Sequence, residues 1–137
     1  MQYKYSKIDL EQFAVLTDAP IDNNAEIKIR TDLEFAYSRE NRLLANKITI
    51  TATDNDQMLM KAVMSSYFEI APDSIEEISE DDGRLVFDPM SLVQFASLNY
   101  GSLRGALYVK TANTPLKDLV IPPIYFHKII TSAFTIE

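Results

Sequence analysis

Few side chains in this sequence could carry out catalysis, because the usual nucleophiles and metal ligands are scarce. There is no cysteine, which excludes thiol nucleophiles, disulfides and cysteine-ligated zinc. The single histidine, His127, stands beside Lys128 in a polar setting and is predicted to lie on the surface, with no second histidine for a common zinc or iron site. Three glycines cannot build a phosphate-binding loop. We therefore predict no catalytic residue, no metal and no cofactor.

Carboxylates are the one abundant chemical group, with 20 Asp and Glu against 13 Lys and Arg. Paired carboxylates can act as acid and base, but no spacing in this sequence selects a pair. Residues 72–84 hold six acids and one base without the ligand spacing of a calcium loop. A net charge of −7, with the basic residues scattered, argues against nucleic acid or an anionic membrane surface as a partner.

Binding remains as the activity that the composition favours. Met58, Met60 and Met64 share one face of an expected strand, in a chain that also has seven tyrosines and seven phenylalanines. Methionine adapts to irregular partners and recurs on promiscuous binding surfaces. A methionine stripe on a strand is, however, more often part of a buried core, and by itself it indicates no particular ligand.

Four strands are expected to position these side chains. Residues 27–37 alternate apolar and polar without a break, and residues 48–53 do the same. The turn formers that follow, Asp54 to Asp56, predict an antiparallel pairing of 48–53 with 58–70. In residues 3–16 the apolar positions change phase twice, which predicts a bulged or bent edge strand.

The second half is predicted to be helical, after a solvated loop with about one helical turn in residues 72–84. Asp88 suits an N-cap and Pro89 the first helical position, so a helix of about 20–24 residues should begin there. Its apolar seam is spaced by three and four residues and comprises Val93, Ala96, Tyr100, Leu103 and Leu107. Two glycines inside the helix, Gly101 and Gly105, each cost about 1 kcal/mol relative to alanine, so close helix–helix approach is a candidate reason for them.

After Asn113 to Pro115 we expect an extended linker at 116–123 and a short amphipathic helix at 126–134. Strands followed by helices predict an α+β fold: a single domain, residues 1–137, with a four-stranded antiparallel sheet and both helices packed on one face. The start of the sequence has no signal-peptide core, and no apolar run is long enough to cross a membrane. The expected location is the cytoplasm.

Two stretches resemble the SecB protein-export chaperones. The first is ITITATDNDQMLMKAVMSSYFEI, residues 48–70, which is similar to the family's hairpin of alternating strands before an acidic connection. The second is YGSLRGALYVKTANTPLKDLVIPPIYFHKI, residues 100–129, which is similar to its arginine-bearing long helix, proline-containing turn, extended segment and final helix. Arg104 and the run 119–124 carry most of this likeness, and the order of elements matches across nearly the whole chain.

The resemblance implies a four-stranded antiparallel sheet with two helices on one face, assembled as a dimer of dimers. It implies that unfolded or preprotein polypeptides bind in apolar grooves near the linker and last helix, without ATP. The groove residues implied in this chain are Phe68, Ile121, Pro122, Tyr125 and Phe126. The residues implied at contacts between copies are Val93, Tyr100, Gly101, Arg104 and Gly105.

One feature departs from the family pattern. The export chaperones carry acids on the exposed strand that docks the motor protein SecA, whereas residues 61–66 here, KAVMSS, have none. Docking to SecA is therefore in doubt, and an antitoxin of a toxin–antitoxin system is an alternative partner. We expect an ATP-independent holdase, a chaperone that keeps clients unfolded. The alternatives are a dedicated interaction protein with one partner and, less favoured, a small α+β enzyme or ligand-binding domain.

Overall fold

The architecture is an antiparallel sheet covered on one side by a long helix. The structure, a computed structural model, describes residues 1–22 and 24–137. In chain order its elements are β1 (Tyr3–Val15), β2 (Ile27–Ser38), β3 (Leu43–Asp54), β4 (Gln57–Ile70), α1 (Pro72–Ile78), β5 (Leu85–Phe87), α2 (Pro89–Thr111), the 3-10 turn η1 (Phe126–Lys128) and β6 (Phe134–Ile136). Within the described residues, no helix is both long and apolar enough to span a lipid bilayer.

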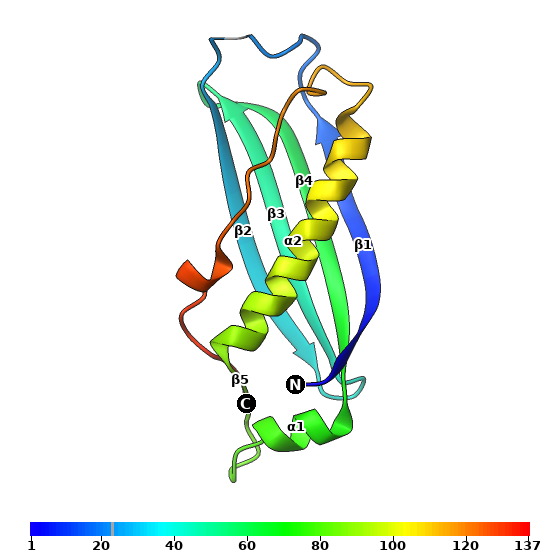
Figure 1. Cartoon of the computed structure of the whole chain (residues 1–137), viewed down its shortest axis with the longest axis vertical. Helices are drawn as coiled ribbons and strands as arrows, with labels where there is room; N and C mark the ends of the chain where they lie inside the picture. Colours follow the sequence, from blue (N-terminus) through cyan, green and yellow to red (C-terminus); the bar gives the residue numbers. More distant parts are fainter. Residues whose placement is uncertain (23) are drawn as a thin grey trace.

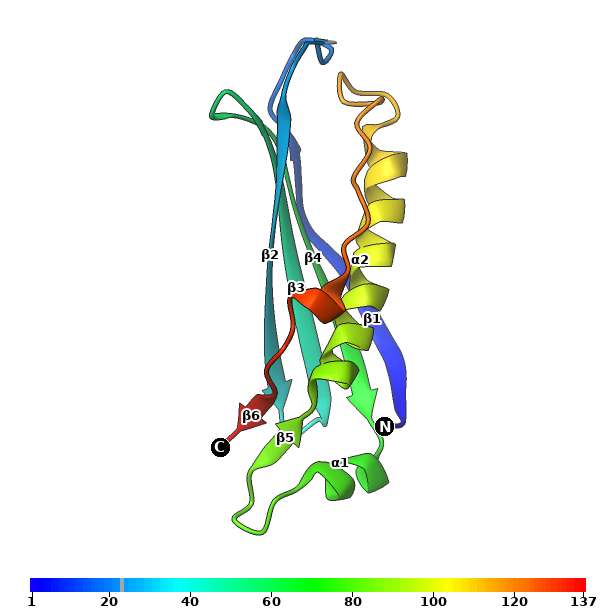
Figure 2. The same ribbon diagram turned by 60° about the vertical axis from the view of Figure 1, so that its left-hand side comes forward.

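The large sheet has the strand order β1-β4-β3-β2, with all neighbours antiparallel. Figure 2 shows α2 and the segment that follows it on the same face, while the opposite face of the sheet is uncovered. The turn between β3 and β4 places Asn55 and Asp56 at φ 48° and 64°, values that these short polar side chains tolerate. The predicted α+β class, with a four-stranded antiparallel sheet, a long helix and a short helix, is confirmed.

Strand β1 is the bulged edge strand that its changing apolar phase predicts. Its pairing with β4 shifts register between Tyr5 and Lys7, and again between Leu10 and Gln12. Each shift inserts one residue, and this returns the next apolar side chain to the covered face. The two phase changes in the sequence therefore mark the two bulges.

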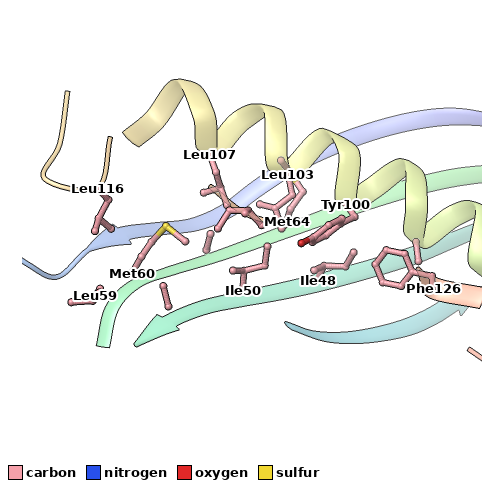
Figure 3. Close-up of a cluster of buried hydrophobic side chains, with 14 residues drawn as sticks. Ile48, Ile50, Leu59, Met60, Met64, Tyr100, Leu103, Leu107, Leu116 and Phe126 are labelled. Atoms are coloured by element: carbon pink, nitrogen blue, oxygen red, sulfur yellow. The ribbon is translucent and has the colours of Figure 1, made fainter. Parts of the chain in front are cut away.

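Helix α2 begins at the predicted position, with Asp88 as N-cap and Pro89 as first residue, and is 23 residues long. Four seam residues are buried against the sheet and Val93 is half-buried. Figure 3 shows three of them (Tyr100, Leu103 and Leu107) facing isoleucine and methionine side chains of β3 and β4. The methionine stripe is divided: Met60 and Met64 are core residues, and Met58 is exposed at the end of the sheet.

The core has two apolar clusters, here called the upper cluster (around Met60 and Leu107) and the lower cluster (around Phe68 and Phe87). A buried polar network lies between them. The Asn99 side-chain amide donates to the Asn46 backbone carbonyl and side-chain oxygen, both at 2.9 Å, and its oxygen accepts from the Ser66 hydroxyl at 2.6 Å. Ser66 in turn bonds the Tyr5 hydroxyl, and the Asn46 amide donates to the Glu34 carbonyl at 3.3 Å. The network therefore ties α2 to all four strands, and because every buried polar atom in it has a partner it fixes how the helix sits on the sheet.

Two regions differ from the sequence-based expectation. Residues 72–84 contain more regular structure than the predicted loop with one helical turn. Helix α1 occupies Pro72–Ile78, and its Ile75 and Ile78 pack against the lower cluster. The Ser74 hydroxyl accepts a hydrogen bond from the backbone amide of Gln2 at 2.7 Å, which ties α1 to the start of β1.

The C-terminal helix predicted at 126–134 is also wrong in extent. It is reduced to the turn Phe126–Lys128, and the chain then extends into β6, which pairs with β5. A nine-residue helix with β-branched residues at 129–131 gains little from local hydrogen bonds. Pairing with β5, a strand that the analysis of the sequence did not predict, satisfies this backbone instead.

Candidate polypeptide-binding surface

Residues 116–126, here called the strap, return from the end of α2 along the covered face of the sheet (Figure 1). Leu116, Ile121 and Phe126 anchor the strap in the upper apolar cluster, each with 8% or less of its surface exposed. Pro122 and Pro123 have no amide hydrogen, so this part of the chain cannot join the sheet as an ordinary strand. The strap is consequently held by side-chain burial rather than by backbone pairing.

Two side chains of α2 bind the strap backbone. The Tyr100 hydroxyl donates to the Pro122 carbonyl at 2.6 Å, and Arg104 Nε donates to the Ile121 carbonyl at 3.0 Å. The Tyr100 ring packs edge-on against Phe126, with 5.5 Å between ring centroids. Burial raises the pKa of Tyr100 above its ordinary value of 10.0, although the Arg104 guanidinium acts in the opposite direction. Tyr100 and Arg104 therefore hold the strap within their own chain.

The residues predicted at contacts between copies consequently separate into two groups. Tyr100, Arg104 and Val93 face their own sheet or strap, whereas Gly101 and Gly105 are exposed on α2, and Gly105 borders a groove between α2 and the strap. A Cβ atom at either glycine would meet no atom of this chain within 4 Å. Packing inside the chain thus gives no reason for these two glycines, and their place in a contact between copies stays a prediction.

A groove of about 540 Å³ runs between α2 and the strap. Its lining comprises Met60, Arg104, Gly105, Leu107, Tyr108, Thr111 and residues 117–121. Tyr108 and Val120 lie on opposite sides of it, and 80% and 79% of their surfaces are exposed. Apolar surface in a concave site gains free energy when another apolar group covers it, whatever that group's detailed shape. The groove suits the side chains of an extended apolar polypeptide.

Exposed apolar surface continues at the lower end of the strap and just past it. Tyr125 and Ile129 are exposed, and the Lys128 ammonium lies 5.5 Å from the centre of the Tyr125 ring. His127 is exposed, as predicted, and its ring lies 6.0 Å from that of Tyr125. This region offers an aromatic face with positive charge beside it.

The predicted groove residues are only partly at the surface. Pro122 and Tyr125 are exposed, whereas Ile121 and Phe126 are inward anchors of the strap. Phe68 is fully buried in the lower cluster between Tyr3, Tyr5 and Phe95, so the structure does not bring it to the groove.

Four further apolar residues in and around the strap are exposed but were not predicted from the sequence: Tyr108, Val109, Val120 and Ile129. A signal for the first two was present. Both are apolar but lie off the helix seam, next to Leu107, where a helix covering only its own sheet would carry polar residues. No such signal marks Val120 or Ile129, because exposure in a segment without regular periodicity depends on what the segment packs against.

A second, larger hollow of about 750 Å³ lies where the loop after β1 meets the end of α2. Asp18, Asp22 and Asp118 line it, with prolines and small polar residues. Across residues 1–22 and 24–137, however, no three carboxylate or histidine side chains converge closely enough to hold a metal ion.

Comparison with known proteins finds a similarity of fold. No protein-family model matches the sequence, and no curated protein matches it. Among solved structures, the chain is similar to the Mycobacterium tuberculosis Rv1957 SecB-like chaperone in complex with a ChAD peptide from the Rv1956 HigA1 antitoxin, with a TM-score of 0.56. That likeness covers 89% of this chain and 90% of the other, at 14% sequence identity.

The fold is SecB-like. At this identity the likeness concerns the fold and not the individual side chains. The SecB-like fold confirms the resemblance that residues 48–70 and 100–129 suggest.

Proposed function

We propose that this protein is a holdase chaperone, which binds unfolded polypeptides through the groove between α2 and the strap. The observation that carries the proposal is the pair Tyr108 and Val120, two large apolar side chains left exposed on either side of one concave surface. Large apolar groups facing water in a groove are typical of surfaces that bind a partner. The SecB-like fold supports the same conclusion.

Binding without ATP fits the positions of the glycines. All three are accounted for: Gly83 lies in the turn before β5 with φ 87°, and Gly101 and Gly105 lie inside α2. None is available for a loop that wraps phosphates. The proposed binding energy comes from apolar burial alone, with a strap already fixed by its anchors so that little ordering is needed on binding.

The proposed assembly is a dimer of dimers acting in the cytoplasm. Gly101 and Gly105, both exposed on α2, would allow a second helix to approach closely. Solution mass tests this part: we expect four times the 15.6 kDa of one chain, and a monomer would contradict it.

The central test is suppression of client aggregation at stoichiometric ratio. We expect Tyr108→Ser, alone and more strongly with Val120→Ser, to lower suppression of the aggregation of a denatured client. Met90→Ser is the matched control, because Met90 is as exposed as Tyr108 but lies about 27 Å away along α2 at 1.5 Å per residue. Equal loss in the control, or no suppression by the unchanged protein, would refute the proposal.

A second candidate is a chaperone dedicated to one partner, such as an antitoxin. It is favoured by the solved complex, in which a SecB-like chaperone holds an antitoxin peptide. Capture from the native host separates the two: a holdase returns a heterogeneous set of clients, and a dedicated chaperone returns one stoichiometric partner. Export through SecA is the less favoured version of the first proposal, since residues 61–66 carry no acid.

A further inference from the structure

The edge of β5 is occupied by the chain's own C-terminal strand. In β6, Phe134 pairs with Phe87, Thr135 with Val86 and Ile136 with Leu85. These three residue pairs form the whole ladder, which is well below the length of an ordinary strand pairing. The contact has the form of β-augmentation, in which an extended segment adds to a free strand edge.

The side chains that β6 covers are more buried than those of β6 itself. Leu85 and Phe87 are buried, and Phe87 also packs against Tyr37 with 5.2 Å between ring centroids. Phe134 lies over Phe87 and Phe35 at 6.3 and 6.1 Å, yet Phe134 and Ile136 remain only half-buried. Leu85 and Phe87 thus belong to the core with β6 in place, and β6 covers them with side chains that are only half-buried.

The segment that leads into β6 covers an apolar surface with poorly matched side chains. A trough of about 270 Å³ lies between this segment and the side chains of Leu33, Phe35 and Leu92. Above this trough the chain places Thr131, Ser132 and Ala133, which are small and exposed. A segment with larger apolar residues at these three positions would bury more of the trough.

Arg39 adds recognition that is independent of side chains. Its guanidinium donates to the main-chain oxygens of Gly83, Ile136 and Glu137 at 2.9, 3.3 and 3.1 Å. An extended segment seated beside β5 in the register of β6 would present a carbonyl in the place of the Ile136 carbonyl, whatever its sequence. Arg39 can therefore hold an incoming strand as well as the resident one.

We propose that β5, Arg39 and the trough form a second polypeptide-binding site, which β6 occupies until another chain displaces it. The ligand class is an extended segment with an aromatic residue, any residue and then an aliphatic residue, preceded by three large apolar residues. This deepens the proposed holdase function and rests on it. Because β6 is only three residues long and half-buried, its displacement costs little free energy. Segments of this kind are the first to detach locally in native proteins.

The test uses the full-length protein and two labelled heptapeptides. One is TSAFTIE, the sequence of residues 131–137, and the other is LIVFTIE, which places larger apolar residues over the trough. We expect LIVFTIE to bind more tightly than TSAFTIE. Weakening the resident with Phe134→Ala and Ile136→Ala should tighten the apparent binding of both peptides by about tenfold, because apparent affinity scales with the fraction of molecules whose site is vacant.

Thr135→Ala is the matched control, since it alters the same strand at a side chain that is exposed, and it should leave both affinities unchanged. Equal peptide affinity in the double variant and the unchanged protein would overturn the proposal. A second measurement covers the case in which the double variant loses structure: in the unchanged protein, LIVFTIE should accelerate hydrogen exchange at residues 134–136 while residues 85–87 stay protected. Unaltered exchange at 134–136 would equally overturn it.

Dimerisation of the unchanged protein through mutual exchange of β6, with no binding of peptide, would also contradict the proposal.

Peptide binding at β5 is measured separately from client aggregation, which tests the groove between α2 and the strap. Peptide exchange can succeed while Tyr108→Ser leaves aggregation suppression intact, or fail while Tyr108→Ser abolishes it. The two proposals can therefore fail independently.

Discussion

The strap and β6 are two extended segments on the same covered side of the molecule, and they are held in opposite ways. The strap has no strand partner and is fixed by three buried anchors and by hydrogen bonds from Tyr100 and Arg104. Strand β6 has a backbone partner but only half-buried side chains. The comparison teaches that backbone pairing alone does not make a segment part of the core.

The difference has a functional consequence. A wall of a binding groove must stay in place when a client leaves, which suits a segment held by buried anchors. A segment that is to be displaced must be held weakly, which suits a short edge pairing over a partly covered trough. The four predictions that follow test this contrast, from the largest expected effect to the smallest.

Phe126→Ala should be the most damaging change. Phe126 is 2% exposed, and removing a buried phenylalanine side chain costs about 3–5 kcal/mol of unfolding free energy through lost burial and the cavity left behind. Urea denaturation of the purified variant measures the loss. A loss below about 1 kcal/mol would show that the strap is not anchored in the core.

Asn99→Ala should follow. The change leaves buried groups of Ser66 and Asn46 without their partner, at a cost of about 1–3 kcal/mol. Gln94→Ala, on the exposed side of the same helix, is the control and should stay within about 0.5 kcal/mol of the unchanged protein. Equal stability of the two variants would show that the network does not hold α2 in its position beside the strap.

Tyr100→Phe should have a smaller effect that depends on pH. Loss of the bond to the Pro122 carbonyl should cost about 0.5–1.5 kcal/mol near neutral pH. Because burial raises the folded-state pKa of Tyr100 above 10.0, the folded protein holds this proton more tightly than the unfolded chain does. That stabilisation is complete below pH 10 and is lost as the pH rises through the folded-state pKa.

Denaturation between pH 9 and pH 11 measures this alkaline loss. We expect a shallower fall in stability for Tyr100→Phe, and not a flat one, because burial also raises the pKa of Tyr3 and of Tyr37. An unchanged slope would show that Tyr100 does not titrate from a buried site.

Phe134→Ala should have the smallest effect on global unfolding, about 1 kcal/mol, since Phe134 is half-buried at a three-residue pairing. Hydrogen exchange at residues 134–136 should nevertheless rise strongly, because local opening there does not require the core to unfold. A global loss as large as that of Phe126→Ala would erase the contrast between the two segments.

Much of the sheet and of α2 could be predicted because the relevant signals are local. The alternation in residues 27–37, the Asn55 and Asp56 turn, and the Asp88 and Pro89 helix start each depend on a few neighbouring residues. The candidate site was predicted less completely. Of the predicted groove residues, Phe68 and Phe126 are buried, and Ile121 is buried but lines the groove. Tyr108 and Val120, which also line it, were not expected.

The reason is that an apolar residue carries no mark of which side it faces in a segment without periodicity. Phe126 and Tyr125 are adjacent aromatics in the sequence, and one is an anchor while the other is exposed. Only the position of the strap over Tyr100 separates them, and that position depends on packing between elements that are distant in the chain.

The amino-acid sequence by itself determined the elements with strict periodicity: four strands, an irregular β1 and a helix of about 20–24 residues with its starting residue. Tertiary structure decided residues 112–137, where the pattern in 126–134 favours a helix but residues 134–136 pair with β5. A short segment gains too little from its own hydrogen bonds to determine its conformation, so contacts with distant residues determine it instead.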